Sequence, residues 1–182
     1  MVIKIYFFRY IHYDSWWYGG PQHGGCVKWD TPSNVFPNGM VNLYKQTNFK
    51  SVAHSRVWSS NVTYASQNGG QYNFLIDHQN LKSLPDDQKF WDDLFLNASK
   101  WGLETYEQDW LITQTMQFTP TLTDVDLGRR WLLQMGIGAS KQNITIQYCM
   151  ALSRHILQSL EITQVTYARA STDYDNSLEN GI

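Results

Sequence analysis

Five stretches of the chain are almost continuously apolar and rich in β-branched and aromatic residues, which is typical of β-strands. They cover residues 3–13, 51–58, 103–110, 143–150 and 164–169. An exposed hairpin would alternate apolar and polar positions. The pattern instead predicts strands that are buried on both faces, as in a parallel sheet covered by helices.

Three segments between these strands have helical patterns. Pro85, Asp86 and Asp87 are typical of a helix start, and Trp101 with Gly102 ends the pattern. Apolar residues recur between them at three-to-four spacing, at Phe90, Trp91, Leu94, Phe95 and Ala98. Residues 126–136 and 153–160 also have helical patterns, and the second places Ile156, Leu157 and Leu160 along its face. Strands and helices therefore alternate, which predicts an α/β fold with right-handed crossovers.

The turns after the strands favour a barrel over a doubly wound sheet. The glycine-rich residues 19–25 lack the Gly-x-Gly-x-x-Gly spacing of a dinucleotide-binding turn, and no helix follows them directly. Polar residues instead lie at or after the end of every predicted strand, at Asp14, His54, Arg56, Glu107, Asp109, Gln147, Arg169 and Asp173. Functional side chains at the carboxyl ends of several strands are typical of a (β/α) barrel. We therefore predict one domain over residues 1–182, an incomplete (β/α)8 TIM barrel of about five βα units.

Composition narrows the classes of partner. The 182 residues carry a net charge of −2, and Arg129-Arg130 is the longest basic run, which argues against a nucleic-acid partner. There is no apolar run of about 18 residues, so no membrane-spanning segment is expected. Cys26 and Cys149 are too few for a disulfide-rich scaffold, and Cys149 is interpreted as a small buried hydrophobic residue rather than a nucleophile.

Three Asn-x-Ser/Thr sequons bear on localisation. They begin at Asn61, Asn97 and Asn143 and favour a secreted, lysosomal or otherwise extracellular glycoprotein. Lys4 and Arg9 interrupt the first apolar stretch, which therefore does not have the core of a signal peptide.

Two carboxylates are the candidate catalytic residues. Asp109 follows a hydrophobic strand and is next to an indole; its alternative role is to cap the next helix, although no helical pattern begins at once. Asp173, with Asp175 close to it, is the second candidate, and its alternative is a solvated turn. Glycosidic bond cleavage requires two such carboxylates, one that attacks or stabilises the sugar and one that transfers a proton.

Tryptophan side chains accompany these carboxylates. Trp16, Trp17, Trp58 and Trp110 each end or follow a predicted strand. Sugars present flat C–H faces that stack on indole rings, so these residues are candidate carbohydrate-binding side chains. The alternative for each ring is a place in the hydrophobic core.

Four short motifs resemble the α-galactosidase clan of glycoside hydrolases, families 27 and 36. They are Tyr-Asp-Ser-Trp-Trp at 13–17, Phe-Pro-Asn-Gly-Met at 36–40, Glu-Gln-Asp-Trp at 107–110 and Arg-Ala-Ser-Thr-Asp at 169–173. The clan has an Asp-x-Trp motif after its second strand, a Phe-Pro-x-Gly-Met helix entry, a Lys-x-Asp nucleophile motif and an Arg-x-Ser-x-Asp acid/base motif. Each motif is weak alone, but the four occur in the same order over most of the chain.

The resemblance implies a retaining hydrolase of α-linked sugars that needs no cofactor or metal. Asp109 would be the nucleophile, Asp173 the general acid/base, and Asp14 a ligand for sugar hydroxyls. Arg169 would orient a turn or a hydroxyl. The remaining candidate substrate-binding residues are Arg56 and Glu107, together with the four tryptophans.

Two departures from the clan pattern affect this interpretation. Glu107 stands where the clan has Lys; facing Asp109 from the same side of a strand, it would raise the pKa of the Asp109 carboxyl. The five strands match strands two to six of eight, so three strands are missing. We therefore expect the 182-residue chain alone to be poorly folded or inactive.

Two other functions remain open. One is a non-catalytic carbohydrate-binding barrel, which Glu107 favours. The other, less favoured, is a metal-dependent hydrolase with ligands from His12, His54 and His155, although none of these has the spacing of a metal site. His12 and His54 are expected to pack and to form hydrogen bonds near the strand ends.

Overall fold

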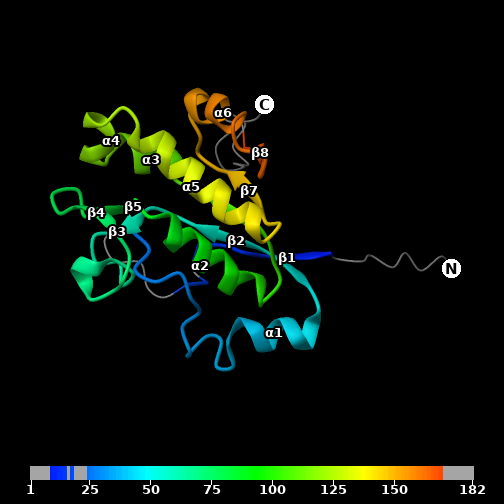
Figure 1. The fold of residues 1–182 in the computed structure, drawn as a ribbon. Coiled ribbons are helices and arrows are strands. Elements are labelled where there is room, and N and C mark those ends of the chain that lie inside the picture. Colours follow the sequence, from blue (N-terminus) through cyan, green and yellow to red (C-terminus); the bar gives the residue numbers. More distant parts are fainter. Residues whose placement is uncertain (1–8, 16, 19–23, 170–182) are drawn as a thin grey trace, which may run out of the picture.

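A five-stranded parallel sheet lies at the centre of the fold (Figure 1). The computed structural model describes residues 9–15, 17–18 and 24–169. The strands of this sheet are β1 (Tyr10–Tyr13), β2 (Lys50–Ser55), β6 (Leu103–Gln108), β7 (Thr145–Tyr148) and β8 (Val165–Ala168). Each lies within one of the five predicted stretches or starts one residue before it, so the predicted parallel strands are confirmed.

The strand order of this sheet is consistent with part of a (β/α) barrel. Its spatial order, β1-β2-β6-β7-β8, follows the order along the chain. Right-handed crossovers that all advance in one direction place their helices on one face of the sheet, whereas a doubly wound sheet reverses direction. The described sheet is open, because β1 pairs only with β2 and β8 pairs only with β7.

Helices α2 (Gln88–Ser99) and α5 (Leu127–Lys141) pack against each other over one face of the sheet (Figure 1). The α2 side chains that the sequence assigned to one face are all buried, and the Asp87 carboxylate caps the helix by accepting a hydrogen bond from the Lys89 amide. The two helices approach closely at Gly138 of α5, where a Cβ would lie 2.9 Å from the backbone of Trp91. The aromatic residues of α2 thus form the centre of the core.

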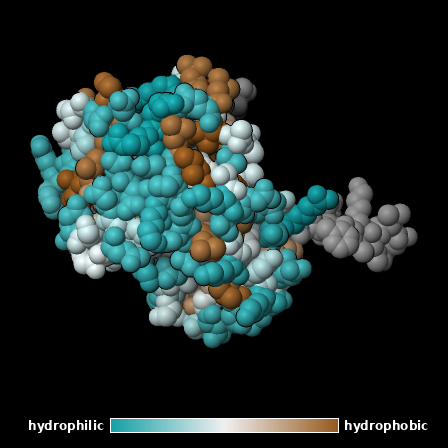
Figure 2. All heavy atoms as spheres, viewed as in Figure 1, coloured by the Kyte–Doolittle hydropathy of each residue, from teal (hydrophilic) through white to brown (hydrophobic). Residues whose placement is uncertain are grey.

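The last helix and the edge strands are less buried than their sequences predict. Helix α6 (Ser153–Ser159) is present, but Ile156, Leu157 and Leu160 are 46%, 67% and 83% exposed. Figure 2 shows these hydrophobic side chains at the top of the molecule, over α6. Strands β1 and β8 are also only partly buried. A sequence pattern reports that a face is apolar, but burial depends on a neighbouring element, and the described residues leave this face of α6 largely uncovered.

A small antiparallel sheet between β2 and α2 was not predicted. It consists of β3 (Trp58–Ser59), β4 (Phe74–Asp77) and β5 (Lys82–Pro85), with a 3-10 turn at Ser66–Asn68. The shorter helices are α1 (Gly39–Thr47), α3 (Leu111–Met116) and α4 (Thr119–Thr123). The Gln114 side chain of α3 accepts a hydrogen bond from the Trp58 amide and donates one to the Ser83 carbonyl, which fixes this sheet beside the end of β6. None of the described helices is long and apolar enough to cross a membrane.

Candidate functional site

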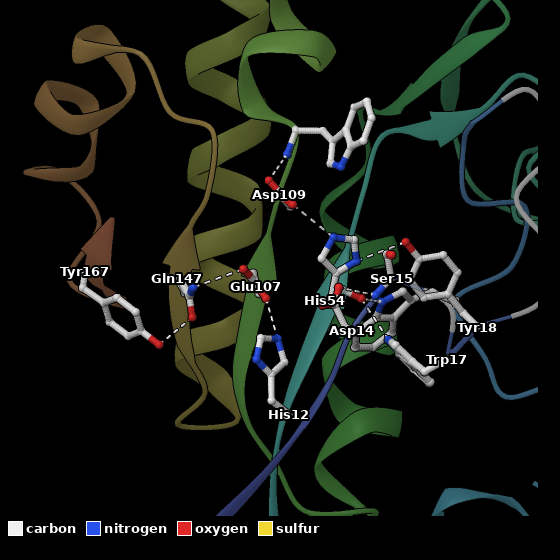
Figure 3. A network of polar contacts seen from close by, with 12 residues as sticks. His12, Asp14, Ser15, Trp17, Tyr18, His54, Glu107, Asp109, Gln147 and Tyr167 are labelled. Carbon is white, nitrogen blue, oxygen red and sulfur yellow. Dashed lines mark hydrogen bonds and ion pairs between the residues drawn. The ribbon is translucent and has the colours of Figure 1, made fainter. Parts of the chain in front are cut away.

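Two rows of side chains lie where the five parallel strands end. The lower row consists of the next-to-last residue of each strand. The upper row consists of the first residue after the end of each strand. The lower row is His12, His54, Glu107, Gln147 and Tyr167, and the upper row is Asp14, Arg56, Asp109, Cys149 and Arg169. Residues two apart in a strand share a face, and Figure 3 shows the lower-row side chains on the side of the sheet away from α5. Apart from Asp173, which lies outside the described residues, the polar residues that the sequence placed at strand ends therefore lie along one edge of the sheet.

Asp109 follows β6, the middle strand, and its carboxylate is held from both sides. Its Oδ2 is 3.2 Å from His54 Nε2 on β2, and its Oδ1 accepts a 2.6 Å hydrogen bond from the Trp110 amide. The Cys149 thiol, after β7, also hydrogen-bonds this carboxylate. Burial alone raises the pKa of the Asp109 carboxyl, but these hydrogen bonds outweigh burial and lower the pKa below its ordinary value. Asp109 is therefore an ionised carboxylate with a side chain 13% exposed.

Two expectations about Asp109 are corrected here. The pKa shift is opposite to the one that Glu107 was expected to cause, because Glu107 is engaged elsewhere and donors surround Asp109. A helix, α3, does begin immediately, at Leu111, but its N-cap residue is Trp110 in a left-handed conformation (φ 58°). Asp109 thus precedes the cap residue, and its carboxylate accepts a hydrogen bond from the backbone amide of Trp110 rather than from an amide inside α3.

Glu107 forms the centre of a hydrogen-bond chain along the lower row (Figure 3). Its side chain is 7% exposed. His12 Nε2 lies 2.7 Å from Oε2, and Gln147 Nε2 donates to Oε1 at 3.1 Å. The Tyr167 hydroxyl in turn donates to the Gln147 carbonyl oxygen. Both carboxyl oxygens of the buried Glu107 side chain therefore have a partner, His12 from β1 and the Gln147 amide.

The His12–Glu107 pair predicts a pH dependence of stability. The hydrogen bond to Glu107 raises the pKa of His12, although burial opposes it, and the charges of Glu107 and Asp14 raise it further. A histidine whose pKa is raised on folding adds stability below its unfolded pKa of about 6.5, and this is lost as the pH rises through the folded value. We expect His12→Gln to lose up to about 1 kcal/mol of unfolding free energy at about pH 5.5 and less at about pH 9. The loss is small because the imidazole is half exposed. Urea unfolding at both pH values measures this difference, and an equal loss at both would contradict it.

Trp17 and Trp58 are buried in the core. The prediction that these two rings bind a sugar is therefore wrong, and the alternative of a place in the core is correct. Trp17 is 1% exposed and Trp58 is 0% exposed. The indole N–H groups of Trp17 and Trp29 both donate to the backbone carbonyl of His54, at 3.0 and 2.9 Å. The buried Trp17 ring therefore packs against the backbone of β2.

The other predicted residues have varied environments. Trp110 is partly exposed, and the Arg56 guanidinium lies over its ring, 4.7 Å from the centroid. Asp14 is exposed and accepts a hydrogen bond from the Ser15 amide. Arg169 follows β8, and its amide donates to the Tyr148 carbonyl at 2.9 Å. Trp16, Asp173 and Asp175 lie outside the described residues, so the separation of the two predicted catalytic carboxylates stays a prediction.

Tyr18 and Tyr167 of this network have no role in the sequence interpretation, which placed Gln147 only at a strand end and interpreted Cys149 as a small buried hydrophobic residue. Burial and Asp109 raise the pKa of the Cys149 thiol far above its usual range, which disfavours a thiolate nucleophile. His155 is buried with its pKa lowered to about 4 by burial, and its Nδ1 accepts a hydrogen bond from the Leu152 amide at the start of α6. Within residues 9–15, 17–18 and 24–169, no three His, Cys, Asp or Glu side chains are placed to hold a metal ion.

Comparison with solved structures links this fold to a known enzyme. The chain is similar to the alpha-galactosidase from Thermus thermophilus in complex with stachyose, with a TM-score of 0.53 and 15% identity over 81% of this chain and 35% of that chain. The chain thus spans about a third of the length of that protein. No protein-family model and no curated protein matches the sequence. At this identity the likeness concerns the fold, which is a parallel α/β sheet related to that of an α-galactosidase.

Proposed function

We propose that this chain is part of the catalytic barrel of a retaining glycoside hydrolase that acts on α-linked sugars. The observation that carries the proposal is the ionised Asp109 carboxylate at the end of the middle strand, next to a row of hydrogen-bonding side chains. Catalytic groups of (β/α) barrels lie at this edge of the sheet. The fold relationship to an α-galactosidase supports the choice of α-linked substrates.

In the proposed reaction, Asp109 attacks the anomeric carbon and forms a covalent glycosyl-enzyme. The bond to the leaving oxygen breaks as the general acid, assigned to Asp173 from the sequence, donates a proton to that oxygen. Asp173 then removes a proton from water as the water oxygen attacks the anomeric carbon, the bond to Asp109 breaks, and the sugar is released with retained configuration. This mechanism requires the two carboxyl groups to stand about 5 Å apart. Arg56, Trp110, Asp14 and Arg169 are the proposed sugar contacts, because they follow the strands at the same edge.

A non-catalytic carbohydrate-binding barrel is the second candidate. It is favoured by the donors on Asp109, because a carboxylate that already accepts hydrogen bonds from His54, Cys149 and the Trp110 amide is a weaker nucleophile. The glycosidase is preferred because a carboxylate has lone pairs for about four hydrogen bonds, which leaves room for attack.

Product stereochemistry tests the proposal. The longest natural form of the protein is incubated with a panel of 4-nitrophenyl α-glycosides, and proton NMR follows the first sugar anomer released. We expect the α-anomer, and an epoxide cyclitol inactivator of matching configuration should label Asp109 in peptide mass spectrometry. Release of the β-anomer would contradict retention. Sugar binding without cleavage of any glycoside would favour the second candidate.

A further inference from the structure

His54 is a buried residue whose two ring nitrogens both have a hydrogen-bond partner. Its side chain is 3% exposed, and each ring nitrogen has one partner: Nε2 lies 3.2 Å from Asp109 Oδ2, and Nδ1 lies 3.2 Å from the Tyr18 hydroxyl (Figure 3). The Tyr18 ring also stacks on the imidazole, with an interplanar angle of 14°. Tyr18, His54 and Asp109 therefore form one linear hydrogen-bond chain.

The donors in this chain can be assigned from its end groups. Asp109 is ionised and can only accept, so the proton lies on His54 Nε2. Burial raises the pKa of Tyr18 far above its usual range, so its hydroxyl stays protonated and can donate to Nδ1. An imidazole that donates from Nε2 to Asp109 and accepts at Nδ1 from the Tyr18 hydroxyl satisfies all three groups, so the bond from Tyr18 favours this tautomer.

The backbone of His54 is fixed as well. Its carbonyl oxygen accepts the indole N–H groups of both Trp17 and Trp29. These two rings are in edge contact, with centroids 5.0 Å apart, and both are buried. The two indole donors therefore hold the backbone of His54, and the hydrogen bonds of its ring hold Nε2 next to Asp109.

We propose that His54 is a positioning residue that orients the Asp109 carboxylate through its Nε2–H, with Tyr18 selecting the required tautomer. This inference rests on the proposed function, because orientation of Asp109 matters for rate only if Asp109 reacts. The nucleophilic oxygen must be aligned with the anomeric carbon, and a small misplacement reduces the rate far more than it reduces binding.

Substitutions at His54 separate this role from a structural one. His54→Leu removes the donor, and we expect kcat to fall about 100-fold with KM nearly unchanged. His54→Gln keeps an N–H group near the position of Nε2 and should recover kcat to within about tenfold of wild type. His78→Leu is the matched control, since His78 is exposed in the turn after β4 and should leave kcat unchanged. Equal kcat in wild type and His54→Leu would overturn the proposal.

Nitrogen NMR of the imidazole gives a readout that does not depend on turnover. We expect the wild-type ring of His54 to be protonated on Nε2 only, and Tyr18→Phe to yield a mixture of tautomers. We also expect the pKa of the Asp109 carboxyl to rise in His54→Leu, which removes the donor, and to rise less in His54→Gln, which keeps an N–H group. A ring protonated on Nδ1 alone would overturn the inference even in an active enzyme. Correct tautomers in a protein that cleaves no glycoside would instead refute the proposed function.

Discussion

Asp109→Asn is expected to reduce kcat about 1,000-fold or more, while the dissociation constant of the sugar changes less than about tenfold. The amide has nearly the same size as the carboxylate, and its carbonyl oxygen can still accept a hydrogen bond from His54 or from the Trp110 amide. It cannot form the glycosyl-enzyme, because the amide oxygen is a poor nucleophile. Steady-state kinetics with an aryl α-glycoside and calorimetric titration with the free sugar measure the two quantities.

Asp30→Asn is the control for this experiment. Asp30 is an exposed carboxylate that forms an ion pair with Lys28, and it does not follow a strand of the parallel sheet. Its removal should leave kcat within about twofold of wild type, since an exposed pair contributes little to stability. An Asp109→Asn protein that retained full turnover would rule out Asp109 as the nucleophile. Equal sugar binding by both proteins without any turnover would identify a carbohydrate-binding barrel.

Trp17→Ala should be among the most destabilising substitutions in the chain. It empties the space of a fully buried ring and removes the indole donor to the His54 carbonyl, and we expect a loss of about 3–5 kcal/mol of unfolding free energy. Because whole domains are stable by only about 5–15 kcal/mol, this variant is expected to unfold at much lower urea concentration than wild type. An unchanged unfolding midpoint would show that Trp17 is not in the core.

Trp110→Ala is the matched variant and should weaken sugar binding more than it lowers the stability of the fold. Trp110 is partly exposed, so its removal should cost about 1 kcal/mol or less, including the contact with Arg56. If Trp110 stacks on the sugar, binding should weaken up to about tenfold. Comparing the two variants by urea unfolding and by sugar titration separates a core tryptophan from a binding one, although both follow predicted strands.

The main strands and helices were predictable because their signals are local and strong. Continuous apolar stretches identified β2, β6 and β7, and the cap at Asp87 with its following apolar residues identified α2. The antiparallel sheet was missed because β3 has two residues and β4 and β5 have four each, which is too short for a periodic pattern. Helix α3 was missed because nothing in the sequence indicates the left-handed conformation of Trp110 that precedes it.

The strand ends that carry these polar side chains were predictable from the sequence, but the contacts between the side chains were not. Each strand ends in two side chains separated by one residue, and this alternation indicated which groups share a face. The sequence could not indicate that Glu107 is paired with His12, because these residues are 95 positions apart and are joined across β2. It also could not distinguish Trp17 from Trp110, because strand position alone does not tell which indole turns inward.

The paired indole donors on the His54 carbonyl have an optical consequence. Two of the eight tryptophans, Trp17 and Trp29, share one acceptor on the strand next to Asp109. Indole emission responds to loss of such a contact and to the entry of water. The protein therefore carries two indoles beside the candidate site, and the part of the unfolding red shift that Trp17→Phe and Trp29→Phe remove would report when that strand separates.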